Sequence, residues 1–169
     1  MEKKSYKEFL KNITTFVFDI DGVLTNGQVL VTNEGELLRS MSVKDGFVMK
    51  LAVEKGYNIC IITGGNNQGA KKRLEDLGIT DIFMKKAQKL NSFLQYQQQK
   101  GLKKEEILYM GDDIPDIPPM LHSGLATCPQ DAVPEVKAVA NYISHLNGGE
   151  GCVRDVITQV LKVRGDWNF

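Results

Sequence analysis

The sequence predicts an α/β fold of the Rossmann-like, three-layer type, with a central, mainly parallel sheet. Short apolar runs such as Phe16–Phe18 and Ile107–Met110 are typical of strands that are buried on both faces. Segments with helical spacing of their apolar residues, such as Val43–Lys55, alternate with these runs. Because strands that alternate with helices along a chain pair in parallel, the alternation predicts this fold class.

Length and composition point to a globular chain without a general affinity for polyanions. The 169 residues suffice for one domain with its own core, so we expect a single domain over residues 1–169. Hydrophobic residues make up 42% of the chain and charged residues 25%, which is ordinary for a soluble protein. Lys+Arg and Asp+Glu balance at 21 each, so no net field favours nucleic acid or an anionic membrane.

The cysteines and the N-terminal segment indicate a cytoplasmic protein. Cys60, Cys128 and Cys152 lie far apart and are odd in number, which is typical of reduced thiols rather than of disulfides or a zinc site. The first residues lack the apolar region of a signal peptide, and no segment has the length that spans a bilayer. We therefore expect neither a membrane nor a nucleic acid as partner.

The first third of the chain is expected to hold a short helix, a strand and a hairpin. Residues 6–12 can form the helix that leads into the strand Phe16–Phe18. Two β-like runs, 28–32 and 37–41, flank an Asn/Gly turn and predict a hairpin. Because the hairpin follows the polar end of the first strand directly, it could cover that end as a flap. An edge hairpin without such a role is the alternative.

The remaining elements follow the same alternation. The helix Val43–Lys55 is expected to bury Phe47, and a polar helix at 88–100 is expected to bury Leu94. Thr63 and Gly64 are expected to open a helix that runs to about residue 78. Further strands are predicted at 57–62, 79–84, 107–110, 124–127 and 142–143, with helices at 117–123 and 150–163.

Three of the apolar strands end in polar clusters. Asp19 and Asp21 follow the first, Thr63 and Gly64 follow the second, and Gly111-Asp112-Asp113 follow another. The carboxyl ends of parallel strands share one edge, so these clusters should meet there. Asp19 and Asp21 lie two apart and point the same way in extended chain, where a cation or shared proton must offset their repulsion. Helix caps could explain one such cluster, but three are harder to explain in this way.

The chemistry of these residues favours a phosphate and a hard cation. Asp112, Asp113 and Asp116 form an acidic cluster without His or Cys, which suits Mg²⁺. The hydroxyl of Thr63 and free N–H groups near Gly64 could bind a phosphate oxygen. A plain helix cap at Thr63 is the alternative.

The pattern Asp19-x-Asp21-Gly-x-x-Thr25 resembles the first motif of the haloacid dehalogenase superfamily, and Gly-Asp112-Asp113-x-x-Asp116 resembles its fourth. The resemblance implies that Asp19 is a nucleophile that becomes an aspartyl-phosphate and that Asp21 is a general acid/base. It also implies that Asp19, Asp112 and the backbone carbonyl of Asp21 bind Mg²⁺, with Asp113 and Asp116 around these ligands. Thr63 corresponds to the second motif.

A lysine completes the resemblance. The superfamily takes this cation from the segment between the second and fourth motifs, where Lys85, Lys86 and Lys89 are the candidates. Lys89 is preferred because Lys89-Leu90 opens a helix at the place where related enzymes have Lys-Leu.

Two further segments narrow the resemblance. The chain is too short for a mobile cap domain, and residues 42–46 and 148–155 look like segments of the capless 3-deoxy-D-manno-octulosonate 8-phosphate phosphatases. Those enzymes are homotetramers whose hairpins form a central barrel and whose Gly-Gly segment lies near a neighbour's site. The resemblance implies that substrate contacts come from Asp21, Ser42, Val43, Lys44, Asp45, Gly46, Lys50, Gly64, Arg73, Lys89 and Arg154.

The expected activity is that of a Mg²⁺-dependent phosphomonoesterase acting on a small phosphorylated keto sugar acid. Relatives carry Arg or Glu after Thr-Gly, whereas this chain has Gly65. The side chain that would read the sugar is absent, so a phosphatase of a nine-carbon sugar acid 9-phosphate is an alternative. A noncatalytic assembly module is a second alternative, against which the intact Asp19, Asp21, Lys89 and Asp112 argue.

Overall fold

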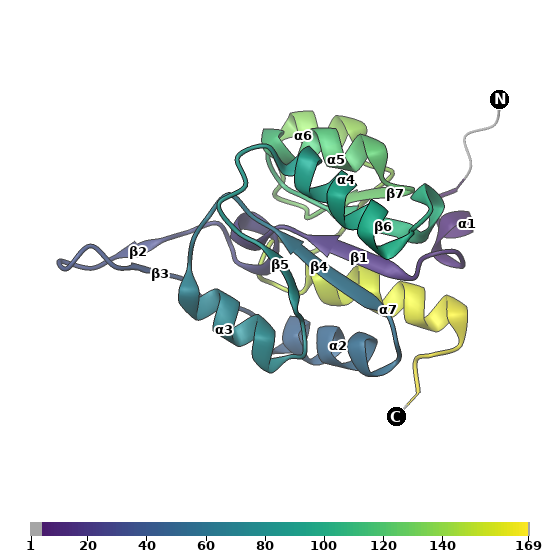
Figure 1. Ribbon diagram of the computed structural model, residues 1–169, viewed down its shortest axis with the longest axis horizontal. Helices are drawn as coiled ribbons and strands as arrows, with labels where there is room; N and C mark the ends of the chain where they lie inside the picture. Colours follow the sequence, from purple (N-terminus) through teal and green to yellow (C-terminus); the bar gives the residue numbers. More distant parts are fainter. Residues whose placement is uncertain (1–4, 169) are drawn as a thin grey trace.

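The computed structural model describes residues 5–168, and it has the three layers expected from the sequence (Figure 1). Six parallel strands form the central sheet in the order β5-β4-β1-β6-β7-β8. The strands are β1 (Thr15–Phe18), β4 (Asn58–Ile62), β5 (Asp81–Phe83), β6 (Ile107–Met110), β7 (Leu125–Cys128) and β8 (Tyr142–Ile143).

Helices cover both faces of the sheet, and each face has its own buried cluster. The helices α1 (Lys7–Leu10), α2 (Val43–Glu54), α3 (Gln68–Asp76) and α7 (Cys152–Arg164) pack on one face. The helices α4 (Lys89–Lys100), α5 (Ile117–His122) and α6 (Pro134–Val139) cover the other (Figure 1). Within the described residues, none of the helices is long and apolar enough to cross a membrane.

The register of the sheet brings the polar strand ends together. In β1, Phe18 pairs with Ile61 of β4 and with Met110 of β6. Asp19 follows β1, Thr63 follows β4 and Gly111 follows β6, so all three leave the sheet at the same edge. All four residues of β1 are buried, which matches the apolar run that predicted a central strand.

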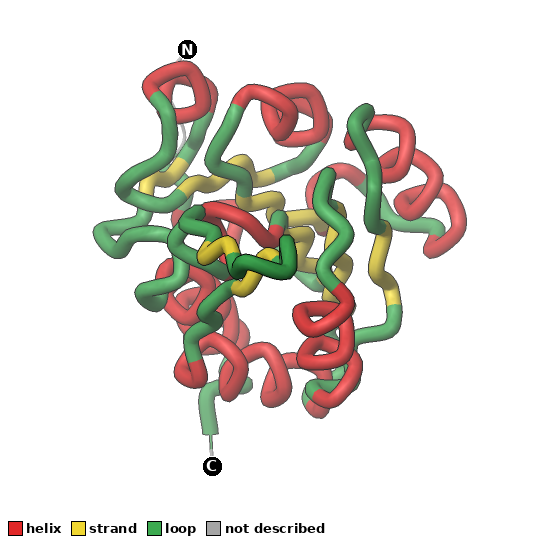
Figure 2. The backbone as a smooth tube through the Cα atoms, turned by 90° about the vertical axis from the view of Figure 1, so that its left-hand side faces the viewer, coloured by secondary structure: helices red, strands yellow, loops and turns green. Residues whose placement is uncertain are grey.

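A two-stranded hairpin projects from this edge (Figure 1). It consists of β2 (Leu30–Val31) and β3 (Leu37–Leu38), which pair in antiparallel fashion, Leu30 with Leu38 and Val31 with Leu37. Figure 2 looks at the molecule from the hairpin side, with the hairpin in front of the strand ends. Between β1 and β4 the chain contains only the turn η1 (Ile20–Leu24), the hairpin and α2, so no cap domain is inserted there.

Several local expectations were wrong. Phe47 is 50% exposed and Leu94 is 40% exposed, whereas the adjacent residues Val48 and Phe93 are buried and occupy the inward faces of the two helices. The helix expected to open at Thr63 begins at Gln68, and the side chain of Asn67 caps it by accepting from the N–H of Ala70 at 2.7 Å. The sequence reasoning missed α6, although the Pro that opens it is a usual first-turn residue.

Candidate active site

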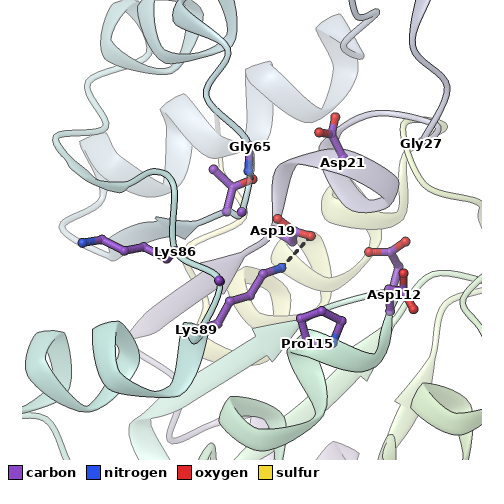
Figure 3. Close-up of a pocket in the computed structure, with 12 residues that line it drawn as sticks. Asp19, Asp21, Gly27, Gly65, Lys86, Lys89, Asp112 and Pro115 are labelled. Atoms are coloured by element: carbon purple, nitrogen blue, oxygen red, sulfur yellow. Dashed lines mark hydrogen bonds and ion pairs between the residues drawn. The ribbon is translucent and has the colours of Figure 1, made fainter.

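Asp19 lies at the end of β1, at the base of an open cavity. Its side chain is nearly buried, its Oδ1 accepts a hydrogen bond from the N–H of Ile20 at 2.7 Å, and its Oδ2 lies 2.7 Å from Nζ of Lys89. The cavity around it is lined by Asp19, Asp21, Gly27, Thr63, Gly64, Gly65, Lys86, Ala87, Lys89, Asp112, Asp113 and Pro115 (Figure 3). The structure therefore gathers four of the predicted carboxylate residues, Asp19, Asp21, Asp112 and Asp113, and Thr63 around one cavity.

The turn after Asp19 depends on a glycine. Gly22 has φ +87°, a left-handed conformation that residues with a Cβ avoid. A Cβ at Gly22 would lie 1.9 Å from Oδ2 of Asp112. The glycine thus serves twice: it turns the chain away from β1, and it leaves room for the carboxylate of Asp112 beside the turn.

Of the three candidate lysines, Lys89 is the one that reaches Asp19. Its side chain is only 5% exposed, and its ammonium group lies 2.7 Å from Oδ2 of Asp19 and 2.8 Å from Oδ1 of Asp116. Lys86 also lines the cavity, but its ammonium group points away from Asp19 in Figure 3. Although burial alone would lower the pKa of Lys89, the charges of Asp116 and Asp19 outweigh it and raise this pKa.

Asp116 is fully engaged by its own chain. Its Oδ1 accepts from Lys89 and from the hydroxyl of Tyr109 at 2.7 Å, and its Oδ2 accepts from the N–H of Asp112 at 3.2 Å. Asp113 is exposed and caps the following turn, since its Oδ1 accepts from the N–H of Ile114 at 2.7 Å. These contacts make Asp116 a buried anchor for Lys89 and leave Asp112 as the carboxylate with free lone pairs.

Asp112 has the features of a metal ligand. Its Oδ1 is buried without a hydrogen-bond partner, and ligand atoms of Asp19, Asp112 and Asp116 lie within 4.8 Å of one another. Burial and the charges of Asp19 and Asp116 raise the pKa of Asp112 to about 8, while burial and Asp116 raise the pKa of Asp19 to about 6. A hard divalent cation bound to Asp19 and Asp112 would relieve both effects, so the residues fit Mg²⁺.

Thr63 lines the same cavity as Asp19 and Asp112. It is 2% exposed, its N–H donates to the carbonyl of Phe83 at 2.9 Å, and its Oγ1 accepts from the N–H of Gly65 at 3.2 Å. Because the helix begins only at Gln68, Thr63 and Gly64 belong to a loop, and a phosphate there would meet loop N–H groups instead of a helix end.

Most of the other residues expected to touch substrate lie around the N-terminus of α2, outside this cavity. Ser42 caps α2 by accepting from the N–H of Asp45, and Asp45, 1% exposed, accepts from the N–H of Arg154 at 2.8 Å. A Cβ at Gly46 would lie 2.6 Å from Nη2 of Arg73. The lining of the cavity includes none of the set Ser42, Val43, Lys44, Asp45, Gly46, Lys50, Arg73 and Arg154.

The C-terminal glycine pair packs against the turn after β1. A Cβ at Gly148 would lie 2.0 Å from the carbonyl oxygen of Gly22, and the N–H of Gly149 donates to the carbonyl of Val23 at 2.9 Å. Close backbone approach therefore explains why glycines occupy these two positions. The guanidinium of Arg154 lies 5.7 Å from the ring centroids of both Phe47 and Trp167.

Sequence reasoning missed Arg39, which reaches the site from the hairpin. Its Nε lies 2.8 Å from Oδ1 of Asp21, and its Nη2 lies 3.1 Å from Oδ2. The two residues are 18 positions apart, and no motif spacing joins them. The available signal was a lone arginine within the run 37–41, which was expected to form part of a flap.

Comparison with known proteins identifies the family to which this chain is related. A model of haloacid dehalogenase-like hydrolases matches residues 77–157. The 3-deoxy-D-manno-octulosonate 8-phosphate phosphatase KdsC of Salmonella typhi is 33% identical over 155 residues, which cover 92% of this chain and 82% of that protein. The chain belongs to this phosphatase family.

Solved structures of the phosphatase family have the same fold. The enzyme from Yersinia pestis is 29% identical with a TM-score of 0.93, covering 95% of this chain and 87% of that chain. The enzyme from Moraxella catarrhalis, solved with a magnesium ion, a phosphate ion and a KDO molecule, is 28% identical with a TM-score of 0.92, covering 96% and 93%. Like these relatives, this chain is a phosphoric monoester hydrolase, and its acidic site fits the magnesium found in one of them.

Proposed function

We propose that this protein hydrolyses 3-deoxy-D-manno-octulosonate 8-phosphate to the free keto sugar acid and inorganic phosphate, and that residues 1–169 form one catalytic domain. Membership of the phosphatase family supports the reaction. The observation that carries the mechanism is the position of Asp19, buried at the cavity base and 2.7 Å from the ammonium of Lys89. A carboxylate held in this way can attack phosphorus while a fixed cation offsets the charge.

The first half of the reaction transfers the phosphoryl group to Asp19. A carboxylate oxygen of Asp19 attacks phosphorus, and the bond to the sugar oxygen breaks. Protonated Asp21 gives its proton to this leaving oxygen. Lys89, the hydroxyl of Thr63 and the N–H of Gly64 bind the phosphoryl oxygens. Asp19, Asp112 and the carbonyl of Asp21 would hold Mg²⁺, which would supply further neutralisation of the phosphate charge.

The second half regenerates Asp19. Water attacks the phosphorus of the aspartyl-phosphate, and Asp21, now ionised, takes a proton from it. The acyl-phosphate bond breaks, inorganic phosphate leaves, and Asp19 returns as a carboxylate. The cycle balances, since Asp21 loses one proton in the first half and regains one in the second.

A panel of phosphate esters tests the function. We expect rapid phosphate release from 3-deoxy-D-manno-octulosonate 8-phosphate, slower release from a nine-carbon sugar acid 9-phosphate and slow but measurable release from p-nitrophenyl phosphate. Preference for the nine-carbon ester would show that this ester is the substrate, and the proposed mechanism would still hold. Absence of turnover with every ester would indicate a noncatalytic module.

We also propose that the active unit is a homotetramer assembled through the hairpin. Leu30 and Val31 are 68% and 64% exposed, and Leu37 and Leu38 are 47% and 46% exposed. Adjacent strand residues point to opposite faces, so the ribbon is apolar on both sides. An isolated two-stranded hairpin with such surfaces is marginal in water, and burial by other copies of the chain would stabilise it.

Sedimentation tests the assembly. Leu30→Asp should shift the protein from tetramer towards monomer, whereas Leu121→Asp, at a leucine of α5 that is 55% exposed, should not. If the assembly shares its sites, Arg154→Ala should raise KM for the sugar phosphate more than for p-nitrophenyl phosphate. Equal effects on both esters, or a fully active wild-type monomer, would show that the sites are not shared between subunits.

We also propose a cytoplasmic location. The three cysteines are buried, free thiols, which is consistent with a reducing compartment.

A further inference from the structure

Arg39 is held unusually firmly for a residue of an exposed hairpin. Its side chain is 10% exposed, whereas its neighbour Leu38 is 46% exposed. While Nε and Nη2 donate to the two oxygens of Asp21, Nη1 donates to the carbonyl of Leu37 at 2.9 Å. All three nitrogens of the guanidinium are therefore engaged, and its plane is fixed by its own strand on one side and by Asp21 on the other.

The contact also fixes Asp21. A fork of two parallel N–H donors holds both oxygens of a carboxylate in one plane, which a single ammonium cannot do. The hydroxyl of Thr25 adds a weaker contact to Oδ1 of Asp21 at 3.3 Å. Because the Asp21 side chain is 33% exposed, it could otherwise turn into solvent.

Gly65 leaves space beside this pair. A Cβ at position 65 would lie 3.4 Å from Oδ2 of Asp21 and 3.8 Å from Nη2 of Arg39. Asp21 and Gly65 both line the cavity that holds Asp19 (Figure 3), so the arginine contacts a residue of the cavity wall.

We propose that Arg39 is a positioning residue that orients the carboxylate of Asp21 so that it can take a proton from water in the second half of the reaction. This inference rests on the proposed function, because it assigns Arg39 a role through Asp21. The fork fixes the plane of the carboxylate that takes the proton from water. As water adds to phosphorus, its proton passes to Asp21 and the acyl-phosphate bond to Asp19 breaks. The hairpin thereby contributes to hydrolysis of the aspartyl-phosphate.

Trapping of the aspartyl-phosphate tests the proposal. Arg39→Met, turning over p-nitrophenyl phosphate, should lower kcat by about 10- to 100-fold and kcat/KM by much less, because only the second half is slowed. Acid quenching during turnover, followed by mass spectrometry, should show more enzyme phosphorylated on Asp19 than in the wild type. Arg39→Lys can make one contact to Asp21 in place of two, so its kcat and its phosphorylated fraction should lie between those of the wild type and Arg39→Met.

Two comparisons separate this role from a structural one. Arg164→Met removes an arginine that contacts Tyr57 and the carbonyl of Lys11, far from the cavity, and should not increase the trapped phosphoenzyme. In an Asp21→Asn background, Arg39→Met should have no further effect on the trapped fraction, since its target is gone. Equal losses in kcat and kcat/KM, with no increase in phosphoenzyme, would overturn the proposal.

The same data distinguish failure of the inference from failure of the proposed function. If Asp21→Asn accumulates phosphoenzyme and Arg39→Met does not, the catalytic assignment stands and Arg39 has no positioning role. If neither the wild type nor any variant is phosphorylated on Asp19 during turnover, the covalent mechanism itself is wrong.

Discussion

The carboxylate of Asp116, which is fully buried, lies 2.8 Å from the ammonium of Lys89 and holds that cation beside the nucleophile. Lys89 also faces Asp19, so one positive charge stands between two carboxylates. The hydroxyl of Tyr109 completes the anchor with a 2.7 Å hydrogen bond to Asp116. This buried arrangement explains how a flexible lysine side chain acquires the fixed position that catalysis requires.

Replacement of the anchor should reduce both stability and rate. Asp116→Asn keeps the shape but leaves Lys89 with one anionic partner, so we expect a loss of about 2–4 kcal/mol in unfolding free energy. A less well-placed Lys89 should lower kcat about 10- to 100-fold. Asp81→Asn, which removes the partner of the half-exposed Lys100, is the matched control and should cost at most about 1 kcal/mol. Wild-type kinetics in Asp116→Asn would contradict the anchoring role.

Loss of the nucleophile should abolish turnover. In Asp19→Asn the amide cannot form an acyl-phosphate, so kcat should fall by at least about 10³-fold for every ester. Because Lys89 still contacts Asp116, we expect the thermal unfolding transition to remain cooperative. Steady-state assays and circular dichroism provide the two measurements. An unchanged rate of ester hydrolysis would exclude Asp19 as the attacking group.

The metal requirement should depend on Asp112. Asp112→Ala removes a carboxylate whose Oδ1 has no partner within the protein, so the Mg²⁺ concentration for half-maximal rate should rise at least about tenfold. Isothermal titration of Mg²⁺ into the metal-free variant should show the same weakening without turnover. Asp76→Ala, at an exposed carboxylate on α3, is the control. Full wild-type activity after exhaustive treatment with EDTA would count against the site.

The stability of the metal-free protein should fall as the pH rises. Burial and the charges of Asp19 and Asp116 raise the pKa of Asp112 from its ordinary value of 3.8 to about 8. Between these values the folded state keeps a proton that the unfolded chain releases, so folding is increasingly disfavoured as the pH climbs through this window. Asp19, with its pKa raised to about 6, acts in the same direction.

Unfolding in EDTA at pH 5.5, 7 and 8.5 measures this dependence. We expect Asp112→Asn to show a smaller decline than the wild type, since the amide does not titrate. Saturating Mg²⁺ should reverse much of the wild-type decline at the highest pH, because it binds the folded state. Parallel curves for wild type and Asp112→Asn would show that Asp112 keeps an ordinary pKa.

The alternation of strands and helices along most of the chain could be predicted from the sequence, and so could the edge at which the chemistry lies. Apolar runs such as β1 are readable because a strand buried on both faces needs apolar residues at every position. Asp19, Thr63 and Asp112 could be predicted to meet because parallel strands end at one edge. Sequence motifs can predict these catalytic side chains because each one directly follows its strand in the chain.

The tertiary structure alone decided which charges pair and which faces are buried. Arg39 reaches Asp21, and Asp116 reaches Lys89, across 18 and 27 positions of chain. The exposure of Phe47 was likewise set by tertiary packing. Its position in the helix was compatible with an inward side chain, but other side chains occupy the inward face. Ion pairs and packing depend on distances between elements, and those distances are set by how all the elements pack together and by the path of the hairpin. Local sequence patterns do not carry that information.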